Sequence, residues 1–390
     1  MAVYLDHSAT TYLDEAVFSK MEPYFTRKFG NASTPYAYGR EADRAVMEAR
    51  ERTAAALRAS ASEIYFTSGG TESDNWAIKG AAEAAGKGHI ITSSVEHHAV
   101  LDTCRYLETK GFEVTYLPVD AKGMVSAQSV RDALRPDTIL ITVMFANNEV
   151  GTVMPVAEIG AIAREKGILF HTDAVQAVGH CAIDVGAMGI DMLSLSAHKF
   201  YGPKGVGALY IRNGLKIAKF MHGGAQEKDS RAGTTNTPGI VGLGAAIELA
   251  ADTMDAENAH EAALAARLKE GLLKIPYTKL NGHETSRLPG NVNITFEGIE
   301  GEALMTYLDL EGIAVSTGSA CTSGSIHPSH VLMAMGLSPE DARGAVRFTL
   351  GRENTEEQID EVIKKTSDIA AKIREVSPLF AQRKGGIKRV

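Results

Sequence analysis

Short apolar runs alternate with amphipathic helical patterns through the first two thirds of the chain. Several runs are continuous stretches of Ile, Leu, Val and Phe, which is typical of strands buried on both faces of a sheet. One helical segment between them places Ile159, Ile162 and Ala163 on one face and ends at Gly167. The alternation predicts an α/β fold with a mainly parallel sheet of seven strands. The predicted strands are Glu63–Ser68, His89–Ser94, Phe112–Val119, Thr138–Ala146, Ile168–Ala174, Asp191–Ala197 and Val206–Arg212.

The pattern changes after about residue 255. A long Ala- and Leu-rich helix is followed by strand candidates at Asn291–Gly298, Ile313–Ser319 and Ala345–Gly351. Helix starts with a capping-box pattern follow at 338–341, with a proline suited to the first helical position, and at 355–358. We therefore expect a large domain of residues 15–255 and a smaller α+β domain built from residues 1–14 and 256–390.

Composition and charge exclude several classes of function. A net charge of −8 over 390 residues argues against nucleic-acid binding as the main activity. No stretch approaches the ~20 apolar residues that span a bilayer, so no membrane contact is expected. Met1–Tyr12 has no basic run before an apolar core and is not a signal peptide. Three scattered cysteines, Cys104, Cys181 and Cys321, favour a reducing cytoplasmic location.

Two polar residues end neighbouring predicted strands. Lys199 follows the strand Asp191–Ala197 and precedes a Gly- and Pro-rich loop, at the end of the sheet where ligands bind in such folds. A lysine there can form a Schiff base, although a surface lysine is the commoner reading when it is taken alone. Asp173 ends the preceding strand, where a carboxylate can keep a pyridine nitrogen protonated, or simply cap a turn. Their pairing raises a cofactor site above the ordinary alternatives.

A glycine-rich turn leads from a strand into a helix at Thr67-Ser68-Gly69-Gly70-Thr71-Glu72-Ser73-Asp74-Asn75. The N–H groups at such a helix start can bind a phosphate dianion. The Gly-x4-Gly-Lys-Ser/Thr pattern of ATPases is absent from the chain. The cluster Glu96-His97-His98 lacks zinc-site spacing if it lies on a strand, so we expect no metal, and one histidine to be functional.

These segments together resemble the cysteine desulfurases, fold-type I pyridoxal-phosphate enzymes related to the class V aminotransferases. The resemblance runs from Tyr4-Leu5-Asp6-His7-Ser8-Ala9-Thr10-Thr11 to Arg347-Phe348-Thr349-Leu350-Gly351-Arg352. Its most specific stretch is Ser316-Thr317-Gly318-Ser319-Ala320-Cys321-Thr322-Ser323-Gly324, which is similar to the sulfur-accepting loop of group I, the NifS and IscS type. The Arg-x-Gly-His-x-Cys pattern of the other group is absent. The resemblance implies a fold-type I transferase whose smaller domain carries the cysteine loop.

The resemblance also implies a role for each matching residue. Lys199 would carry pyridoxal 5'-phosphate, and His97 would stack on its ring and assist proton transfer. Asp173 would pair with the pyridine nitrogen and Gln176 with the phenolic oxygen, while Asn148 and Arg347 would contact the substrate, L-cysteine. Asn148 would also touch the cofactor. The remaining implied cofactor contacts, mostly to phosphate, are Gly70, Thr71, Ser196 and His198, with Thr234 supplied by the other subunit of a homodimer.

Cys321 distinguishes a desulfurase from its relatives. As a thiolate it would attack the substrate sulfur, leaving a persulfide on the enzyme and L-alanine as product. The sulfur would then pass to an acceptor protein, such as an iron–sulfur scaffold. A free cysteine is more often a small buried residue, which is the interpretation for Cys104 and Cys181. The alternatives are a class V aminotransferase, a selenocysteine lyase or, against the retained cofactor residues, a non-enzymatic assembly scaffold.

Overall fold

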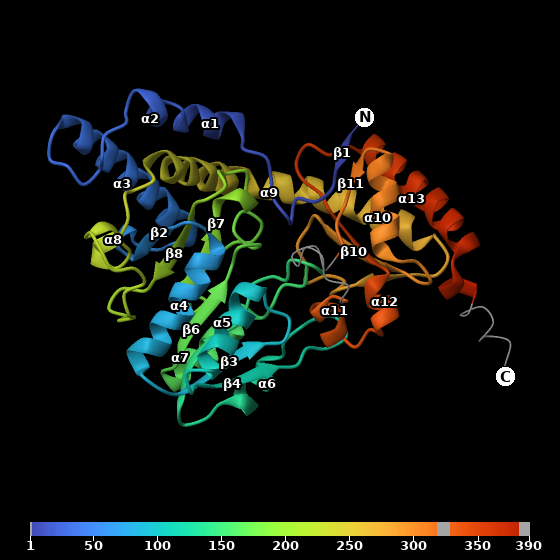
Figure 1. The fold of residues 1–390 in the computed structure, drawn as a ribbon, viewed down its shortest axis with the longest axis horizontal. Coiled ribbons are helices and arrows are strands. Elements are labelled where there is room, and N and C mark those ends of the chain that lie inside the picture. The colour runs from blue at the N-terminus through green and yellow to red at the C-terminus, as the bar shows by residue number, and fades with distance from the viewer. Residues whose placement is uncertain (1, 318–327, 382–390) are drawn as a thin grey trace.

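A sheet of seven strands forms the centre of the larger part of the molecule (Figure 1). The computed structural model describes residues 2–317 and 328–381. The strands are β2 (Ile64–Thr67), β3 (His89–Ser93), β4 (Glu113–Leu117), β5 (Thr138–Thr142), β6 (Leu169–Asp173), β7 (Met192–Ser196) and β8 (Gly207–Ile211). They lie in the order β2-β8-β7-β6-β5-β3-β4, and only the pairs β2–β8 and β8–β7 are antiparallel. The predicted seven-stranded, mainly parallel sheet is therefore confirmed.

Helices cover both faces of this sheet, which explains the continuous apolar runs. Ile90 packs in one core with residues of the helices α4 (Gly70–Ala85) and α5 (His98–Glu108). Its neighbour Ile91 faces the opposite core, with α3 (Ala37–Leu57) and α7 (Val156–Lys166). Because successive side chains of a strand point to opposite faces, both must be apolar. Shorter helices of this part are α1 (Glu15–Met21), α2 (Pro23–Thr26), α6 (Ala127–Ala133) and α8 (Gln226–Asp229).

The C-terminal part contains two smaller sheets. Strands β9 (Thr278–Asn281), β10 (Asn291–Phe296) and β12 (Ala345–Thr349) form an antiparallel sheet in the order β12-β10-β9. Strand β1 (Val3–Tyr4) crosses from the N-terminus to pair in parallel with β11 (Ile313–Ala314). The strands predicted near 291 and 345 are confirmed. The one predicted at 313–319 is shorter in the structure, and its last two residues lie outside the described residues.

Four further helices accompany these sheets: α10 (Gly301–Leu310), α11 (His330–Ala334), α12 (Pro339–Arg343) and α13 (Glu356–Val376). At the start of α13 the Thr355 and Gln358 side chains each bond the other's backbone N–H, so the predicted capping box is confirmed. At α12, Ser338 caps the N–H of Asp341 and Pro339 occupies the first turn. Apolar residues of α13, including Ile359, pack into a core shared with β10 and β12.

One helix of 37 residues, α9 (Thr237–Leu273), runs between the two parts (Figure 1). Its first half packs on α1 and α3, and its second half lies in the core of the C-terminal part. The predicted division between residues 255 and 256 falls inside this helix. No helix in the described ranges is both long and apolar enough to cross a membrane.

Candidate active site

Asp173 and Lys199 meet at the carboxyl ends of two adjacent parallel strands. Asp173 is the last residue of β6, and its register partner Ser194 is the central residue of β7, two residues before that strand ends. A short 3-10 turn, Ala197–Lys199, follows β7 directly and carries Lys199. Because the two strands are neighbours and parallel, their ends lie at the same edge of the sheet.

A cavity of about 260 Å³ opens at this edge. It brings together nine residues that the sequence predicted for the site: Gly70, Thr71, His97, Asn148, Asp173, Gln176, Ser196, His198 and Lys199. Six further residues line it that were not predicted: Ser8, Ala9, Asp74, Met144, Ala146 and Val175. The lining combines an amine, two buried carboxyl groups, imidazoles and the start of a helix.

The glycine-rich turn forms one end of the cavity. Gly69 has φ +151°, a backbone conformation that other residues rarely adopt, and α4 begins at the next residue. A Cβ on Gly70 would lie 2.5 Å from Cγ2 of Val175, so the turn approaches the loop after β6 very closely. The first N–H groups of a helix have no intrahelical partners, and the helix dipole favours an anion there. The turn could therefore hold a phosphate group.

Two residues at the end of β7, Ser196 and His198, lie on the same side of the cavity. The Ser196 hydroxyl lies 3.6 Å from where a Cβ on Gly69 would stand. The Nδ1 atom of His198 is 3.1 Å from the hydroxyl of Thr10. Burial, followed by the charges of Lys199 and Lys204, lowers the pKa of His198 to about 4, so this imidazole is neutral at pH 7.

Asp173 and His97 form the polar wall of the cavity. Burial raises the pKa of Asp173, while His97, the N–H of Val175 and Lys199 act in the opposite direction. His97 caps α5, since its Nδ1 accepts the N–H of Ala99 at 3.1 Å. Burial lowers the pKa of His97. A neutral ring that accepts at Nδ1 carries its hydrogen on Nε2.

Lys199 is held by the N-terminal segment of the chain. Its Nζ donates to the main-chain carbonyls of Ser8 and Ala9, the second at 2.8 Å. Gln176 donates to the same Ser8 carbonyl at 3.0 Å. The Ser8 N–H in turn donates to the Thr349 hydroxyl at 2.9 Å, so this segment connects Lys199 to β12.

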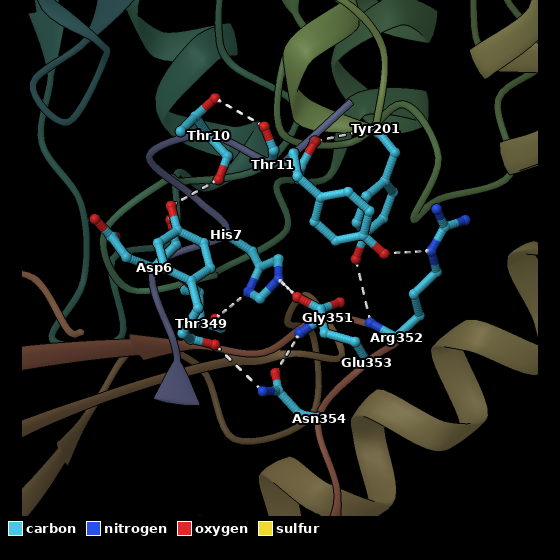
Figure 2. A network of polar contacts seen from close by, with 12 residues as sticks. Asp6, His7, Thr10, Thr11, Tyr201, Thr349, Gly351, Arg352, Glu353 and Asn354 are labelled. Atoms are coloured by element: carbon cyan, nitrogen blue, oxygen red, sulfur yellow. Dashed lines mark hydrogen bonds and ion pairs between the residues drawn. The ribbon is translucent and has the colours of Figure 1, made fainter. Parts of the chain in front are cut away.

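Figure 2 shows how residues 6–11 are fixed between the two parts of the molecule. On one side His7 bonds the Thr349 carbonyl at 2.8 Å and the Glu353 carboxylate at 2.7 Å. On the other side, the Thr11 hydroxyl accepts the N–H of Tyr201 at 2.8 Å. The segment is therefore a structural part of the site although it forms no long element.

Arg347 lies beside the cavity rather than in its lining. It is buried in the centre of β12, where Nη1 donates to the Asn148 carbonyl at 2.9 Å and Nη2 pairs with Asp6 at 2.7 Å. The sequence did not predict the Asp6 contact. A carboxylate that replaced Asp6 would lie next to Asn148, which does line the cavity.

A further predicted residue, Thr234, does not line the cavity. Thr234 is exposed on the segment between α8 and α9. Arg231, on the same segment, forms an ion pair with Glu72 of α4, with 2.7 Å between Nε and Oε1. The predicted contact of Thr234 is with a second subunit, which a single chain does not test. Cys321, the predicted sulfur acceptor, lies outside the described residues.

The structure corrects one premise about Glu96-His97-His98. The cluster does not lie on a strand, because β3 ends at Ser93 and α5 begins at His98. Glu96 is buried and accepts from the Ser93 hydroxyl and the Met144 N–H, and the His98 ring packs 4.8 Å from that of His330. Only His97 of the three reaches the cavity.

Of the other two cysteines, Cys104 is buried as the sequence suggested, whereas Cys181 is only partly buried. Cys104 is buried on α5 and Cys181 is half-buried after β6. Burial raises the pKa of Cys104 to about 12 and that of Cys181 to about 11. A thiol that stays protonated at pH 7 is a poor nucleophile.

Comparisons with known proteins identify the family of the chain. The family model for class-V aminotransferases matches residues 3–362. A curated cysteine desulfurase, IscS of Methanosarcina thermophila, is 59% identical over 97% of this chain and 94% of its own length. A solved NifS-like protein is 40% identical, with a TM-score of 0.90 over 95% of this chain and all of its own. The structure described as SspA in complex with cysteine is 42% identical, with a TM-score of 0.80 over 90% of this chain and all of its own.

The matches extend over nearly the whole length of both partners, so both parts of the molecule share in the likeness. Proteins that share only a fold can have much lower sequence identity than the 40–59% found here over nearly the whole chain. The chain therefore belongs to the class-V aminotransferase family and, within it, to the cysteine desulfurases.

Proposed function

We propose that the chain is a pyridoxal-phosphate-dependent enzyme that converts L-cysteine to L-alanine and takes up the sulfur on Cys321. One observation carries the proposal: a single cavity combines Lys199, Asp173 and His97 with the glycine turn of α4. The relationship to cysteine desulfurases supports the reaction, and the cysteine-bound relative supports the substrate.

The residues present fit pyridoxal phosphate. The turn at Gly69–Thr71, with Ser196 and His198 beside it, offers donors for the phosphate. Asp173 would face the pyridine nitrogen, whose positive charge would hold this buried carboxyl ionised against the effect of burial. Lys199 offers the amine to which the aldehyde binds. When bound, the cofactor withdraws electrons from the substrate and makes its α-proton acidic.

Lys199 and His97 are the proposed proton carriers. The Nζ of Lys199 donates to main-chain carbonyls at the cavity wall, so its amine would have a defined position as a proton carrier. His97 presents the Nε2 side of a neutral ring to the same cavity, since its Nδ1 caps α5. Neutral imidazole can act as a general acid or base near pH 7.

The substrate would be oriented by Arg347 and Asn148. Arg347 suits the substrate carboxylate because guanidinium and carboxylate can form two parallel hydrogen bonds. In the sulfur-transfer step the C–S bond breaks and its electron pair stays on carbon, which takes up a proton on the way to alanine. The thiolate of Cys321 forms the new S–S bond, so the sulfur leaves as a persulfide and no outside oxidant is needed.

Cys321 is proposed from the sequence and from the state of the other two cysteines. Burial keeps the thiols of Cys104 and Cys181 protonated, which leaves Cys321 as the suitable nucleophile of the three. The small polar residues around it, Ser319 and Ser323 among them, favour a loop that can present a thiol to a second protein.

The proposal includes a homodimer and a protein that accepts the sulfur. Thr234 would reach the phosphate of the other subunit, and Arg231 would hold that segment against α4. The acceptor would be an iron–sulfur scaffold or a similar carrier. A thiol that forms a persulfide has to be kept reduced between turnovers, which favours the cytoplasm.

Mass spectrometry of the holoenzyme after incubation with L-cysteine tests the proposal. We expect one added sulfur on the peptide containing Cys321 and one alanine released per sulfur. Cys321→Ser should keep the cofactor but form no persulfide, and Cys104→Ser is the matched control that should form it normally. Conversion of a keto acid without persulfide would identify an aminotransferase instead, and a protein that binds no cofactor would indicate a scaffold.

A further inference from the structure

Arg347 is a buried cation whose pairing is incomplete. Its side chain is only 3% exposed, and a buried guanidinium normally satisfies all of its donors. Nη1 donates to the Asn148 carbonyl and Nη2 to the Asp6 carboxylate. The third nitrogen, Nε, has no partner among the described residues.

A surface pair in the same protein shows what a complete arrangement looks like. Arg267 binds Asp360 through Nε and Nη2 together, both at 2.7 Å to the two carboxylate oxygens. Arg231 binds Glu72 through the same two nitrogens. At Arg347, Asp6 contacts Nη2 through one oxygen only. Arg347 can therefore bind a carboxylate more completely than Asp6 does.

Asp6 is also the more accessible member of the pair. Its side chain is 19% exposed against 3% for Arg347. Its main chain is held independently, because the Tyr4 hydroxyl donates to the Asp6 carbonyl at 3.0 Å and β1 pairs with β11. The Asp6 side chain can rotate away from Arg347 without loss of these contacts.

We propose that Asp6 is an internal competitor that occupies the substrate-carboxylate position on Arg347 and thereby sets the affinity for L-cysteine. The inference rests on the proposed function, in which Arg347 binds that carboxylate. An incoming carboxylate displaces Asp6 toward solvent and bonds Nη2 and Nε together. Asp6 is a specificity-determining residue and does not touch the reacting atoms.

The tether makes Asp6 an effective competitor despite its single contact. A side chain attached next to its binding site acts at a high local concentration, so a weak interaction can still fill the site. The apparent affinity of an incoming carboxylate is its intrinsic affinity multiplied by the fraction of molecules in which Asp6 leaves Arg347 free. A ligand without a carboxylate does not compete for Arg347 and is unaffected.

Two amines that differ by a carboxylate provide the test. The holoenzyme is titrated with L-alanine and with ethylamine, and binding is followed by the absorption of the bound cofactor. In Asp6→Asn, L-alanine should bind about tenfold or more tightly than in the wild type, the scale of one charged hydrogen bond. Ethylamine should bind both proteins equally. Asp6→Glu keeps the charge and should remain near the wild type.

Asp14→Asn is the matched control. It makes the same chemical change eight residues further along the chain and removes an ion pair with Arg352, yet it keeps an amide oxygen that can cap α1. It should change neither affinity. If Asp6→Asn does not fold, Asp6→Ser takes its place.

Weaker or unchanged binding of L-alanine by the Asp6 variant would overturn the inference, because a supporting role for Asp6 predicts a loss. An equal gain for both amines would overturn it too. Failure of the proposed function is a separate result: wild-type enzyme would then form no alanine or persulfide from cysteine.

Discussion

Glu96, the neighbour in sequence of the cavity-lining His97, shows how burial changes a single carboxyl group. Its Oε1 accepts from the Ser93 hydroxyl and the Met144 N–H, while Oε2 has no partner among the described residues. Burial, the largest effect, raises the pKa of Glu96 to about 8. The protonated acid therefore suits its surroundings better than the carboxylate does.

Replacement of Glu96 by Gln should stabilise the protein increasingly as pH rises. The folded wild type retains a proton that the unfolded chain loses above pH 4.5, so wild-type stability falls between pH 4.5 and about 8. The glutamine side chain keeps the acceptor oxygen and cannot ionise. The difference in the free energy of unfolding should grow by up to about 1.4 kcal/mol per pH unit.

Urea denaturation at pH 5, 7 and 8 measures this difference. Glu375→Gln, at an exposed position on α13, is the control and should show no such trend. A difference between Glu96→Gln and wild type that stays constant across the three pH values would show that Glu96 is ionised in the folded protein.

At the scale of elements, the start of α4 is the feature on which the proposed cofactor binding depends. In Gly70→Ala the new methyl group would stand 2.5 Å from Cγ2 of Val175, so the turn or the loop after β6 has to move. The phosphate donors would move with it. We expect the affinity of the apoprotein for pyridoxal phosphate to fall about tenfold or more.

The additional change Val175→Ala should restore much of that affinity, because it removes the atom that the new methyl group meets. Gly186→Ala is the control, since a Cβ there meets only Asp184 Oδ1, at 3.5 Å. Spectrophotometric titration of the four proteins with pyridoxal phosphate gives the comparison. Unchanged binding by Gly70→Ala would place the phosphate elsewhere.

Strands of the large sheet were predictable because their signal is local. Each strand is a run of apolar residues, because a strand buried on both faces needs apolar side chains on both, whichever strands lie beside it. Two strands escaped prediction: β1 has two residues, and β9 alternates with exposed positions such as Lys279. Strands so short or so polar are defined by their pairing partners, which a linear pattern does not contain.

The start of α9 was predicted too late for a physical reason. The sequence suggested a helix after about residue 255, whereas the helix begins at Thr237. Its first turns are rich in glycine, which lowers helix propensity. A Cβ on Gly242 would lie 2.4 Å from Met21 Sδ, and one on Gly244 would lie 2.6 Å from the Ala49 Cα. Close packing on α1 and α3 requires glycine and overrides propensity.

Side chains at the ends of β6 and β7 were predictable for the site, whereas the carbonyls that hold Lys199 were not. Asp173, Lys199 and the glycine turn have recognisable residue types at strand ends. Ser8 and Ala9 act through main-chain oxygens, which every residue has. Asp6 could be recognised as a partner of Arg347 only once β12 had been placed beside the N-terminal segment.

At the scale of the whole molecule, α9 joins the cores of the two parts into one structure. Leu268, in its second half, is fully buried in the C-terminal core. Trp76, the single tryptophan, is buried in the core between α4 and the large sheet. If the helix couples the two cores, a cavity created at Leu268 should also lower the temperature at which the core around Trp76 unfolds.

Leu268→Ala should lower the free energy of unfolding by about 2–5 kcal/mol, the usual cost of such a cavity. Tryptophan fluorescence and far-ultraviolet circular dichroism should show one coincident thermal transition, shifted to lower temperature. Leu310→Ala, at a leucine that is 76% exposed, is the control and should shift little. A fluorescence transition that stays in place while the dichroism shifts would show that the parts unfold independently.

The hydrogen bonds that Lys199 makes to the segment 6–11 have a consequence for biosynthesis. These residues leave the ribosome long before their partners Thr349 and Glu353, which follow more than three hundred residues later. The large sheet can assemble while the chain is still growing, but the wall that positions the lysine amine cannot. A cofactor that met the nascent chain would find only part of the proposed pocket, which is complete only after the C-terminal part has been made and has bound residues 6–11.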